Sequence, residues 1–280
     1  MTTTPTTLSA NGTREQYDWT CTHSSLRDWL VGTLRYDIWL TLAGYDILLR
    51  YRRSLLGPLW LTISMAALIA GMGPLYSALF NIPLSTFFPH LTLGIIFWNF
   101  FSCSIGDGCY TFISAAPYLK QAPYNRSIFT WRTLSRNFLI LLHHMILFVP
   151  IALWAGISLS IEMLLFIPGL FITMLNLLGV ITTVGFLSAR FRDVPQIVSS
   201  ILQLLMFMTP VFWLPESLPD RSKVIMLNPF ASFLSALRSP LLGQVTSLRD
   251  WGIIGVSTLV NLACAITIYR VCRNRVVYWL

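Results

Sequence analysis

The sequence of 280 residues has few charged side chains. Only 11% of its residues are Asp, Glu, Lys or Arg, whereas 55% are hydrophobic. An ordinary soluble domain carries about a quarter charged residues, so this composition excludes that class. Long uncharged stretches indicate an all-α integral membrane protein, because each is long enough to cross a bilayer as a helix.

Several chemical signatures are missing as well. The five cysteines form no CxxC pair, so neither a disulfide framework nor a metal site is indicated. There is no GxxxxGK[ST] loop, and the chain therefore lacks the means to cradle a nucleotide triphosphate. HExxH and GxSxG are absent too. We expect this chain to have no enzyme activity, metal or cofactor of its own.

A net charge of +8 could suggest a nucleic-acid partner. The basic residues, however, fall in short loops between uncharged stretches. Membrane topology is the simpler cause, because cytoplasmic loops carry an excess of Lys and Arg. We therefore expect no nucleic-acid binding.

One stretch indicates the orientation of the chain in the membrane. It begins with a cluster of three arginines, Arg50, Arg52 and Arg53, and no charged residue occurs from Pro58 to Phe80. An arginine at the bilayer centre costs at least about 2.5 kcal/mol, so the membrane surface lies between Arg53 and Pro58. Because arginine clusters beside a span mark the cytoplasmic side, the first span runs from inside to outside.

The hydrophobic pattern predicts six spans with both termini in the cytoplasm. Fifteen of the 19 basic residues then lie inside, and the other four lie between Arg221 and Arg249. The glycines around Asp107 interrupt the second span, and the segment from Ser114 to Arg136 forms a cytoplasmic loop. The expected spans are residues 58–80, 91–113, 137–157, 163–188, 194–214 and 251–269.

The parts outside the spans follow from the same pattern. Residues 1–33 form a cytoplasmic segment without a cleavable signal peptide, and residues 34–57 an amphipathic helix in the cytoplasmic interface. Its apolar face opposes Asp46 and Arg50; packing on the protein's own loops is the alternative. Residues 58–271 form the membrane domain, and residues 272–280 a cytoplasmic tail.

An outer segment between spans five and six is expected to re-enter the membrane as a short helix. Asn228 is a suitable N-cap, Pro229 occupies the first helical position, and Pro240 and Gly243 end the segment. Its apolar run is too short to span.

Two polar features lie within spans. Asp107 is a functional candidate, or it sits hydrated at the cytoplasmic end between helix-loosening glycines. His143 and His144 could form a proton relay, or simply hydrogen-bond between helices.

Six short motifs resemble the ABC-2 type permeases, the membrane subunits of exporters for O-antigen and related polysaccharides. The motifs occur in the family's order between Arg50 and Gly243. They are Arg52–Trp60, Tyr118–Pro123, Ala189–Val194, Thr209–Trp213 with Asn228–Phe230, and Arg238–Gly243.

The resemblance implies a homodimer in the bacterial inner membrane with two ATPase subunits, which supply ATP and Mg²⁺ chemistry, on its cytoplasmic face. The implied cargo is a polyprenyl-pyrophosphate-linked glycan. Alternatives are a permease for capsular polysaccharide, teichoic acid, or a smaller lipid or drug. A secondary transporter fits less well, since coupling ionisable groups near the midplane are sparse.

Three sets of residues are candidate sites. The resemblance places ATPase coupling at Ala116, Tyr118, Leu119, Lys120 and Pro123, although Lys120 could serve orientation alone. Arg50, Arg52 and Arg53 suit the lipid phosphate at the inner leaflet, because arginine forks match phosphate; topogenic charge and anionic-lipid contact are the alternative. Aromatic rings that could stack on sugars are Phe97, Trp98, Phe101, Tyr110, Phe207, Phe212 and Trp213; interfacial anchoring or packing is the alternative.

Overall fold

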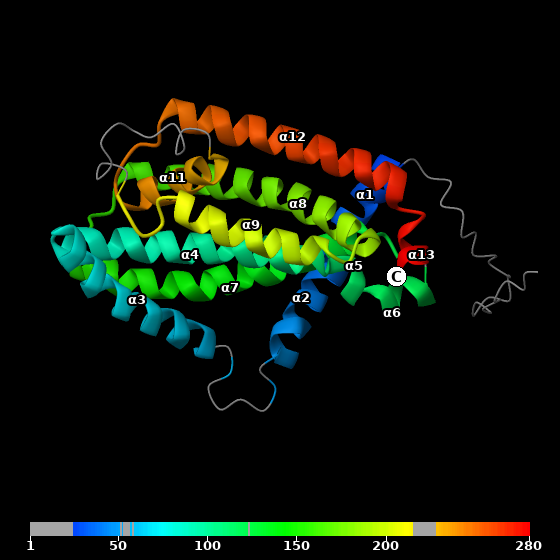
Figure 1. The fold of residues 1–280 in the computed structure, drawn as a ribbon, viewed down its shortest axis with the longest axis horizontal. Helices are drawn as coiled ribbons and strands as arrows, with labels where there is room; N and C mark the ends of the chain where they lie inside the picture. The colour runs from blue at the N-terminus through cyan, green and yellow to red at the C-terminus, as the bar shows by residue number, and fades with distance from the viewer. Residues whose placement is uncertain (1–24, 51, 53–56, 58, 123, 215–227) are drawn as a thin grey trace, which may run out of the picture.

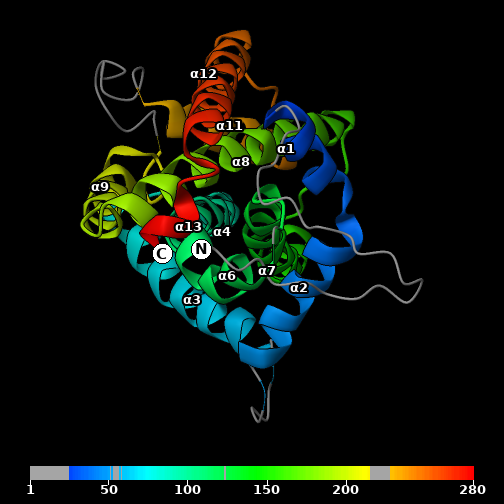
Figure 2. The same ribbon diagram turned by 90° about the vertical axis from the view of Figure 1, so that its right-hand side faces the viewer.

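The computed structural model describes residues 25–50, 52, 57, 59–122, 124–214 and 228–280. This part of the chain is all-helical, as expected, and no strand occurs in it. The long helices run side by side as one bundle (Figure 1). Viewed along the bundle, the other helices surround α4 (Figure 2).

The N-terminal region forms two helices, of which the second lies within the interfacial helix expected over residues 34–57; its course in the interface stays a prediction. Helix α1 covers Ser25–Leu34, and α2 covers Tyr36–Arg50. Asp46, on the charged side of α2, faces the bundle and bonds to α7. Leu34 and Leu49 are exposed, whereas Ala43 and Ile47 are buried.

The next two helices form the first membrane hairpin. Helix α3 covers Leu59–Phe80, in agreement with the first span, and α4 covers Leu84–Cys109. The second span was expected to begin at Leu91 and to be interrupted around Asp107. Instead α4 begins seven residues earlier and continues through both glycines, because its packing against α7 and α8 outweighs the weak helix propensity of glycine.

The expected cytoplasmic loop from Ser114 to Arg136 is largely helical. Helix α5 covers Thr111–Ser114, α6 covers Ala116–Gln121, and α7 covers Ser127–Trp154. The third span was expected to begin at Asn137, so Arg132 and Arg136 lie within α7 and not in a loop. Arginines are tolerated in this helix because carboxylates on α2 and α4 pair with them.

The fourth and sixth spans are close to their predicted bounds. A 3-10 turn, η1, covers Ile161–Leu165 and leads directly into α8, which covers Phe166–Arg190. Helix α12 covers Leu248–Cys272, and the tail contains the short helix α13, Val276–Trp279.

The fifth predicted span is shorter than expected. Helix α9 covers Val194–Met208, only 15 residues, whereas a straight crossing needs about 20. Five of the described helices are long and apolar enough to cross a membrane. The number of six spans therefore stays a prediction.

After α9 the chain continues without helix along α4. The carbonyl of Val211 lies against Gly94, where an added Cβ would come within 2.6 Å of that oxygen. Only glycine allows so close an approach of two backbones.

Helix α11, Pro229–Leu241, has the caps predicted from the sequence. The Asn228 side chain accepts a hydrogen bond from the Phe230 amide and donates one to Thr209. Gly243 adopts a φ of 73° just beyond the helix end. The helix packs against α4, α8 and α12; its re-entrant course in a membrane stays a prediction.

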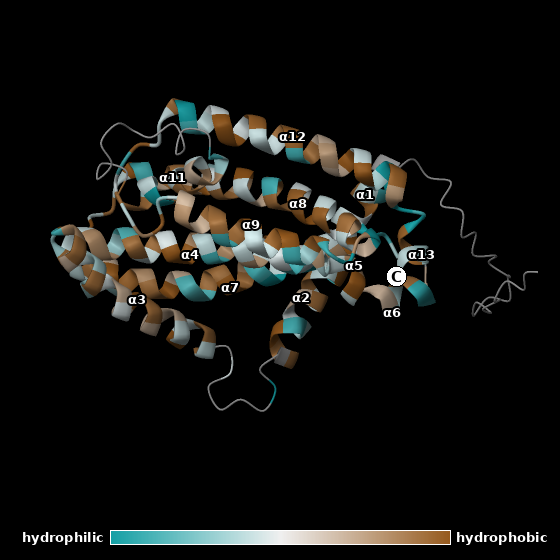
Figure 3. Cartoon of the chain, in the orientation of Figure 1, coloured by the Kyte–Doolittle hydropathy of each residue, from teal (hydrophilic) through white to brown (hydrophobic). Residues whose placement is uncertain are grey.

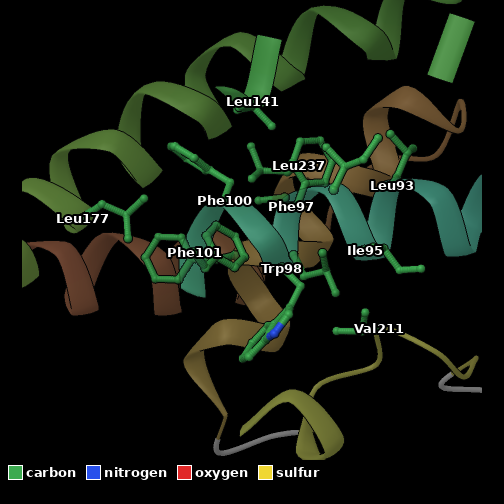
Figure 4. Close-up of a cluster of buried hydrophobic side chains, with 14 of the residues drawn as sticks. Leu93, Ile95, Phe97, Trp98, Phe100, Phe101, Leu141, Leu177, Val211 and Leu237 are labelled. Atoms are coloured by element: carbon green, nitrogen blue, oxygen red, sulfur yellow. The ribbon is translucent and has the colours of Figure 1, made fainter. Parts of the chain in front are cut away.

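The hydrophobic core is organised around α4, which is buried over most of its length. Large rings and aliphatic side chains from α4, α7, α8 and α11 interdigitate here (Figure 4). A second, smaller cluster beneath α6 includes Phe112, Leu119, Phe186, Tyr269 and Val276.

Candidate functional site

The short helix α6 is anchored by one buried side chain. Leu119 is 3% exposed and belongs to the smaller hydrophobic cluster, and Ala115 just before the helix is fully buried. Helices α5 and α13 pack against α6, and the Phe112 and Phe186 rings, 4.3 Å apart, lie in the same cluster. A six-residue helix has little stability of its own, so this base fixes its position.

The residues predicted for coupling therefore divide into two groups. Leu119 faces inward, Ala116 is half-buried, and Tyr118 and Lys120 are exposed together with Gln121. Pro123 lies outside the described residues. Tyr118 and Lys120 can thus contact another protein, whereas Leu119 holds the helix that presents them.

A network of charged side chains lies beside this helix. The Arg132 guanidinium of α7 lies 5.8 Å from the centre of the Tyr118 ring, and its Nε donates to Asp46 of α2 at 2.8 Å. Arg136, one turn further, donates to Asp46 at 3.3 Å and to Asp107 of α4 at 2.8 Å. Asn137 also donates to Asp107, at 3.1 Å. One continuous set of contacts thus joins α6, α7, α2 and α4.

The pairs that involve Asp46 are largely shielded from water. The side chains of Arg132, Arg136 and Asp46 are only 14–18% exposed, whereas Asp107 is 33% exposed. Burial makes such pairs costly to form and costly to break, so they fix one arrangement more than they add net stability. The relative position of α2, α4 and α7 at this end therefore depends on two carboxylates and two guanidiniums.

Asp107 has a definite role in this network. The sequence left open whether it is functional or merely hydrated, and its pairing with Arg136 and Asn137 shows that it joins α4 to α7. His143 contacts the carbonyl of Leu139 on its own helix at 2.8 Å, and the His144 side chain is buried. The choice between a proton relay and bonding between helices stays a prediction.

A second polar cluster, which the sequence did not indicate, positions the segment after α6. Asp28 of α1 is buried; its carboxylate accepts hydrogen bonds from Asn125 at 2.6 Å and from the Tyr269 hydroxyl at 2.7 Å. Arg273 lies 3.8 Å from the same carboxylate. Asp28 and Tyr269 are 241 residues apart, and no motif connects them, so only the folded chain reveals this contact.

Of the three arginines proposed for lipid phosphate, Arg50 is the last residue of α2. Arg52 is exposed and donates its backbone amide to the Leu49 carbonyl. Arg53 and the side chain of Arg50 lie outside the described residues. Their role in lipid recognition stays a prediction.

The aromatic residues predicted to line a path are not gathered on one surface. Phe97, Trp98 and Phe101 are 0–6% exposed and lie in the core (Figure 4). Trp98 and Phe101 pack against Phe230 of α11. In the single chain these three rings face no open surface, which favours the packing alternative for them.

The other four rings of the set are more accessible. Tyr110 and Phe207 are exposed by 54% and 63%. Phe212 is half-buried against Tyr76 of α3, with ring centres 6.1 Å apart, and Trp213 is half-buried as well. Tyr110 and Phe207 are the members that remain open to a ligand.

Comparison with known proteins gives consistent matches. Residues 38–242 match the family model described as ABC-2 type transporter. The chain is 23% identical over 246 residues to an O-antigen export system permease protein RfbA of Klebsiella pneumoniae, covering 86% of this chain and 93% of the relative. An RfbA of Myxococcus xanthus is 25% identical over 209 residues, covering 71% and 78%. The family match extends from α2 to the end of α11 and includes both the α6 surface and the charged network.

Proposed function

The chain belongs to the ABC-2 type transporter family, and we propose that it is the permease subunit of an ATP-driven polysaccharide exporter. Its cargo is a lipid-linked, O-antigen-like glycan. Transport runs from the cytoplasmic side to the outer face of the bacterial inner membrane. The names of the similar proteins, which are O-antigen export permeases, support this choice of cargo.

The observation that carries the proposal is the construction of α6. Its buried Leu119 fixes the helix, while Tyr118 and Lys120 point outward at the end of the bundle that is rich in basic residues. The chain has no phosphate-binding loop, so an ATPase has to bind from outside. A rigidly held helix with an exposed ring and a cation provides a place for it.

The network beside α6 offers a route for the motion. A displacement of Tyr118 would move Arg132, which contacts its ring, and with it Asp46 on α2. Arg136 connects Asp46 to Asp107 on α4. Helix α2 leads toward the arginines at the inner leaflet, and α4 is the centre of the bundle. Coupling of this kind requires elements with two discrete arrangements, and a shielded ion network can be one.

Topology and assembly follow from the same proposal. The described N-terminal helix α1 and the C-terminal helix α13 lie at the same end of the bundle as α6 (Figure 1), which supports cytoplasmic termini. A twofold homodimer would enclose a path at its interface better than one chain can, and two ATPase copies would match that symmetry.

The experiment measures ATP hydrolysis and surface glycan together. We expect the purified chain to hydrolyse no ATP, and the complex with its ATPase to do so. Cells lacking the gene should lose surface glycan and accumulate lipid-linked glycan inside. If surface glycan persists without the chain, the proposed cargo is wrong; if the chain and an ATPase do not copurify, the coupling assignment is wrong.

A further inference from the structure

Helix α4 is open on one narrow side only. From Pro89 to Cys109 every residue is buried except five, all of them small or polar: Asn99, Ser102, Cys103, Gly106 and Asp107. Their spacing of three and four residues places them along one face of the helix. Tyr110, which is exposed, follows on the same face at the cytoplasmic end.

Helix α9 carries a polar face of the same kind. Gln196, Ser199, Ser200 and Gln203 are all exposed, and Phe207 extends this face toward the end of the helix. The hydroxyls of Ser199 and Ser200 donate to the Gln196 carbonyl and keep their lone pairs free to accept. The helix contains no charged residue.

The two faces turn to the same side of the molecule. Leu202 of α9 and Ile105 of α4 line one cavity of about 260 Å³ beneath α9. On each helix the polar face lies roughly 100° around the helix axis from the residue that lines this cavity. Because α4 and α9 are antiparallel, the two rotations have opposite senses when both helices are viewed from one end of the bundle. Both polar faces therefore turn toward the same side. Figure 3 shows pale and teal segments on α4 and α9, which lie next to each other.

Lipid is an unsuitable neighbour for this surface. Amides and hydroxyls in the middle of a membrane helix cost free energy unless they meet polar partners or water. The ligand should be neutral, because the band itself carries no charge and Asp107 beside it on α4 already pairs with Arg136. An amide both donates and accepts hydrogen bonds, as does a sugar hydroxyl, so a polyhydroxyl chain is complementary to it.

We propose that the polar band of Asn99, Ser102, Gln196, Ser199, Ser200 and Gln203 is the surface along which the glycan passes. Tyr110 and Phe207 stand at its two ends and provide ring faces for stacking. Repeated weak hydrogen bonds allow a polymer to slide without a fixed register. The inference rests on the proposed function, and it assigns to amides and hydroxyls the contacts that aromatic rings alone were predicted to make.

A second copy of the chain is the rival occupant. Serine and glutamine can hold two membrane helices together, because small side chains permit close approach and amides bond across the contact. If a second copy covers the band, the band is shielded from water, and cysteines placed in it form disulfides between the two copies. If the band lines a glycan path, it is accessible to water.

Single cysteines in a cysteine-free chain, in membranes with the ATPase, distinguish the two. Ser102→Cys, Ser199→Cys and Gln203→Cys should react with a membrane-impermeant thiol reagent about tenfold or more faster than two controls, as an aqueous path requires. The controls are Ile197→Cys, on another side of α9, and Val256→Cys on α12, both exposed and apolar. Equal rates at all five positions, or disulfides between copies at Ser199→Cys without labelling, would overturn the proposal.

Export provides the second measurement. Gln196→Leu with Gln203→Leu should lower surface glycan about tenfold per protein, the effect of about 1.4 kcal/mol in lost contacts, while Ile197→Leu leaves it unchanged. ATPase activity and the homodimer should survive in both. If the double variant exports normally, the band does not contact glycan. Persistence of surface glycan without the chain would instead overturn the proposed function itself.

Discussion

The Nε of Arg132 on α7 lies 2.8 Å from a carboxylate oxygen of Asp46 on α2. This contact turns the acidic residue of an amphipathic helix away from solvent and toward the bundle. It also places Asp46 within 3.3 Å of Arg136, which binds Asp107 on α4. The end of the bundle nearest α6 thus combines a charged network with the smaller hydrophobic cluster, whereas its middle is held by apolar packing.

Asp46→Asn should destabilise the protein and weaken coupling. It leaves two shielded guanidiniums with one carboxylate between them, and we expect a loss of roughly 1–3 kcal/mol. Thermal unfolding in detergent measures the loss, and transport per ATP hydrolysed measures the coupling. Asp37→Asn is the matched control, because its pair with Arg35 is exposed and contributes about 1 kcal/mol at most. Equal stability of the two variants would contradict the assigned role of Asp46.

Changes at neighbouring positions of α6 should have different effects. Leu119→Ala removes a buried anchor and should cost about 2–5 kcal/mol, so protein levels fall. Tyr118→Ala should leave folding nearly intact but reduce copurification of the ATPase and glycan export. Tyr36→Ala, at another exposed tyrosine, should have neither effect. Normal ATPase binding by Tyr118→Ala would remove this ring from the coupling surface.

Replacement of Arg50, Arg52 and Arg53 by lysine tests phosphate recognition. Charge and orientation are kept, but the planar fork that binds phosphate in two places is lost. We expect surface glycan to fall at least about threefold with normal membrane insertion. Arg35→Lys, at an exposed site on the same side, serves as the control. Unchanged export by the triple variant would leave only topology and anionic-lipid contact as roles for these arginines.

Alanine substitutions at buried and at exposed aromatic residues should have different effects on stability and export. Phe97→Ala and Phe101→Ala empty the core and should cost about 3–5 kcal/mol each, so export falls with the amount of protein. Phe207→Ala should keep stability and lower export per protein molecule. Phe171→Ala, at an exposed ring on α8, should change neither. If all three path variants lower export without loss of protein, the buried rings have a role in transport that packing does not explain.

Much of the organisation could be predicted from the sequence. Runs such as Pro58–Phe80 specify apolar helices long enough to cross a membrane, because the cost of charge in hydrocarbon acts on each segment independently. The direction indicated by the arginines before this run stays a prediction. The N-cap at Asn228 was predictable for a similar reason, since a cap depends on neighbours only two residues away. The family motif Tyr118–Pro123 overlaps α6, and its role in coupling stays a prediction.

Side-chain contacts between helices could not be predicted in this way. Asp46 has a possible partner four residues along its own helix, yet it bonds to arginines 86 and 90 positions away. Asp28 meets Tyr269 across almost the whole chain. Aromatic residues near the centre of a span have the same sequence pattern whether they pack or line a path, so Phe97 and Phe207 were indistinguishable.

The sequence by itself thus determined most of the long apolar helices and which family the motifs resemble. Only the tertiary structure decided which side of each helix is buried. That choice depends on what neighbouring helices offer, such as a carboxylate for Arg132 and a ring for Trp98. The polar faces of α4 and α9 are covered less, and their residues are half-buried or exposed. Free energies of pairing and burial belong to contacts between segments, and a linear pattern contains no information on which segments meet.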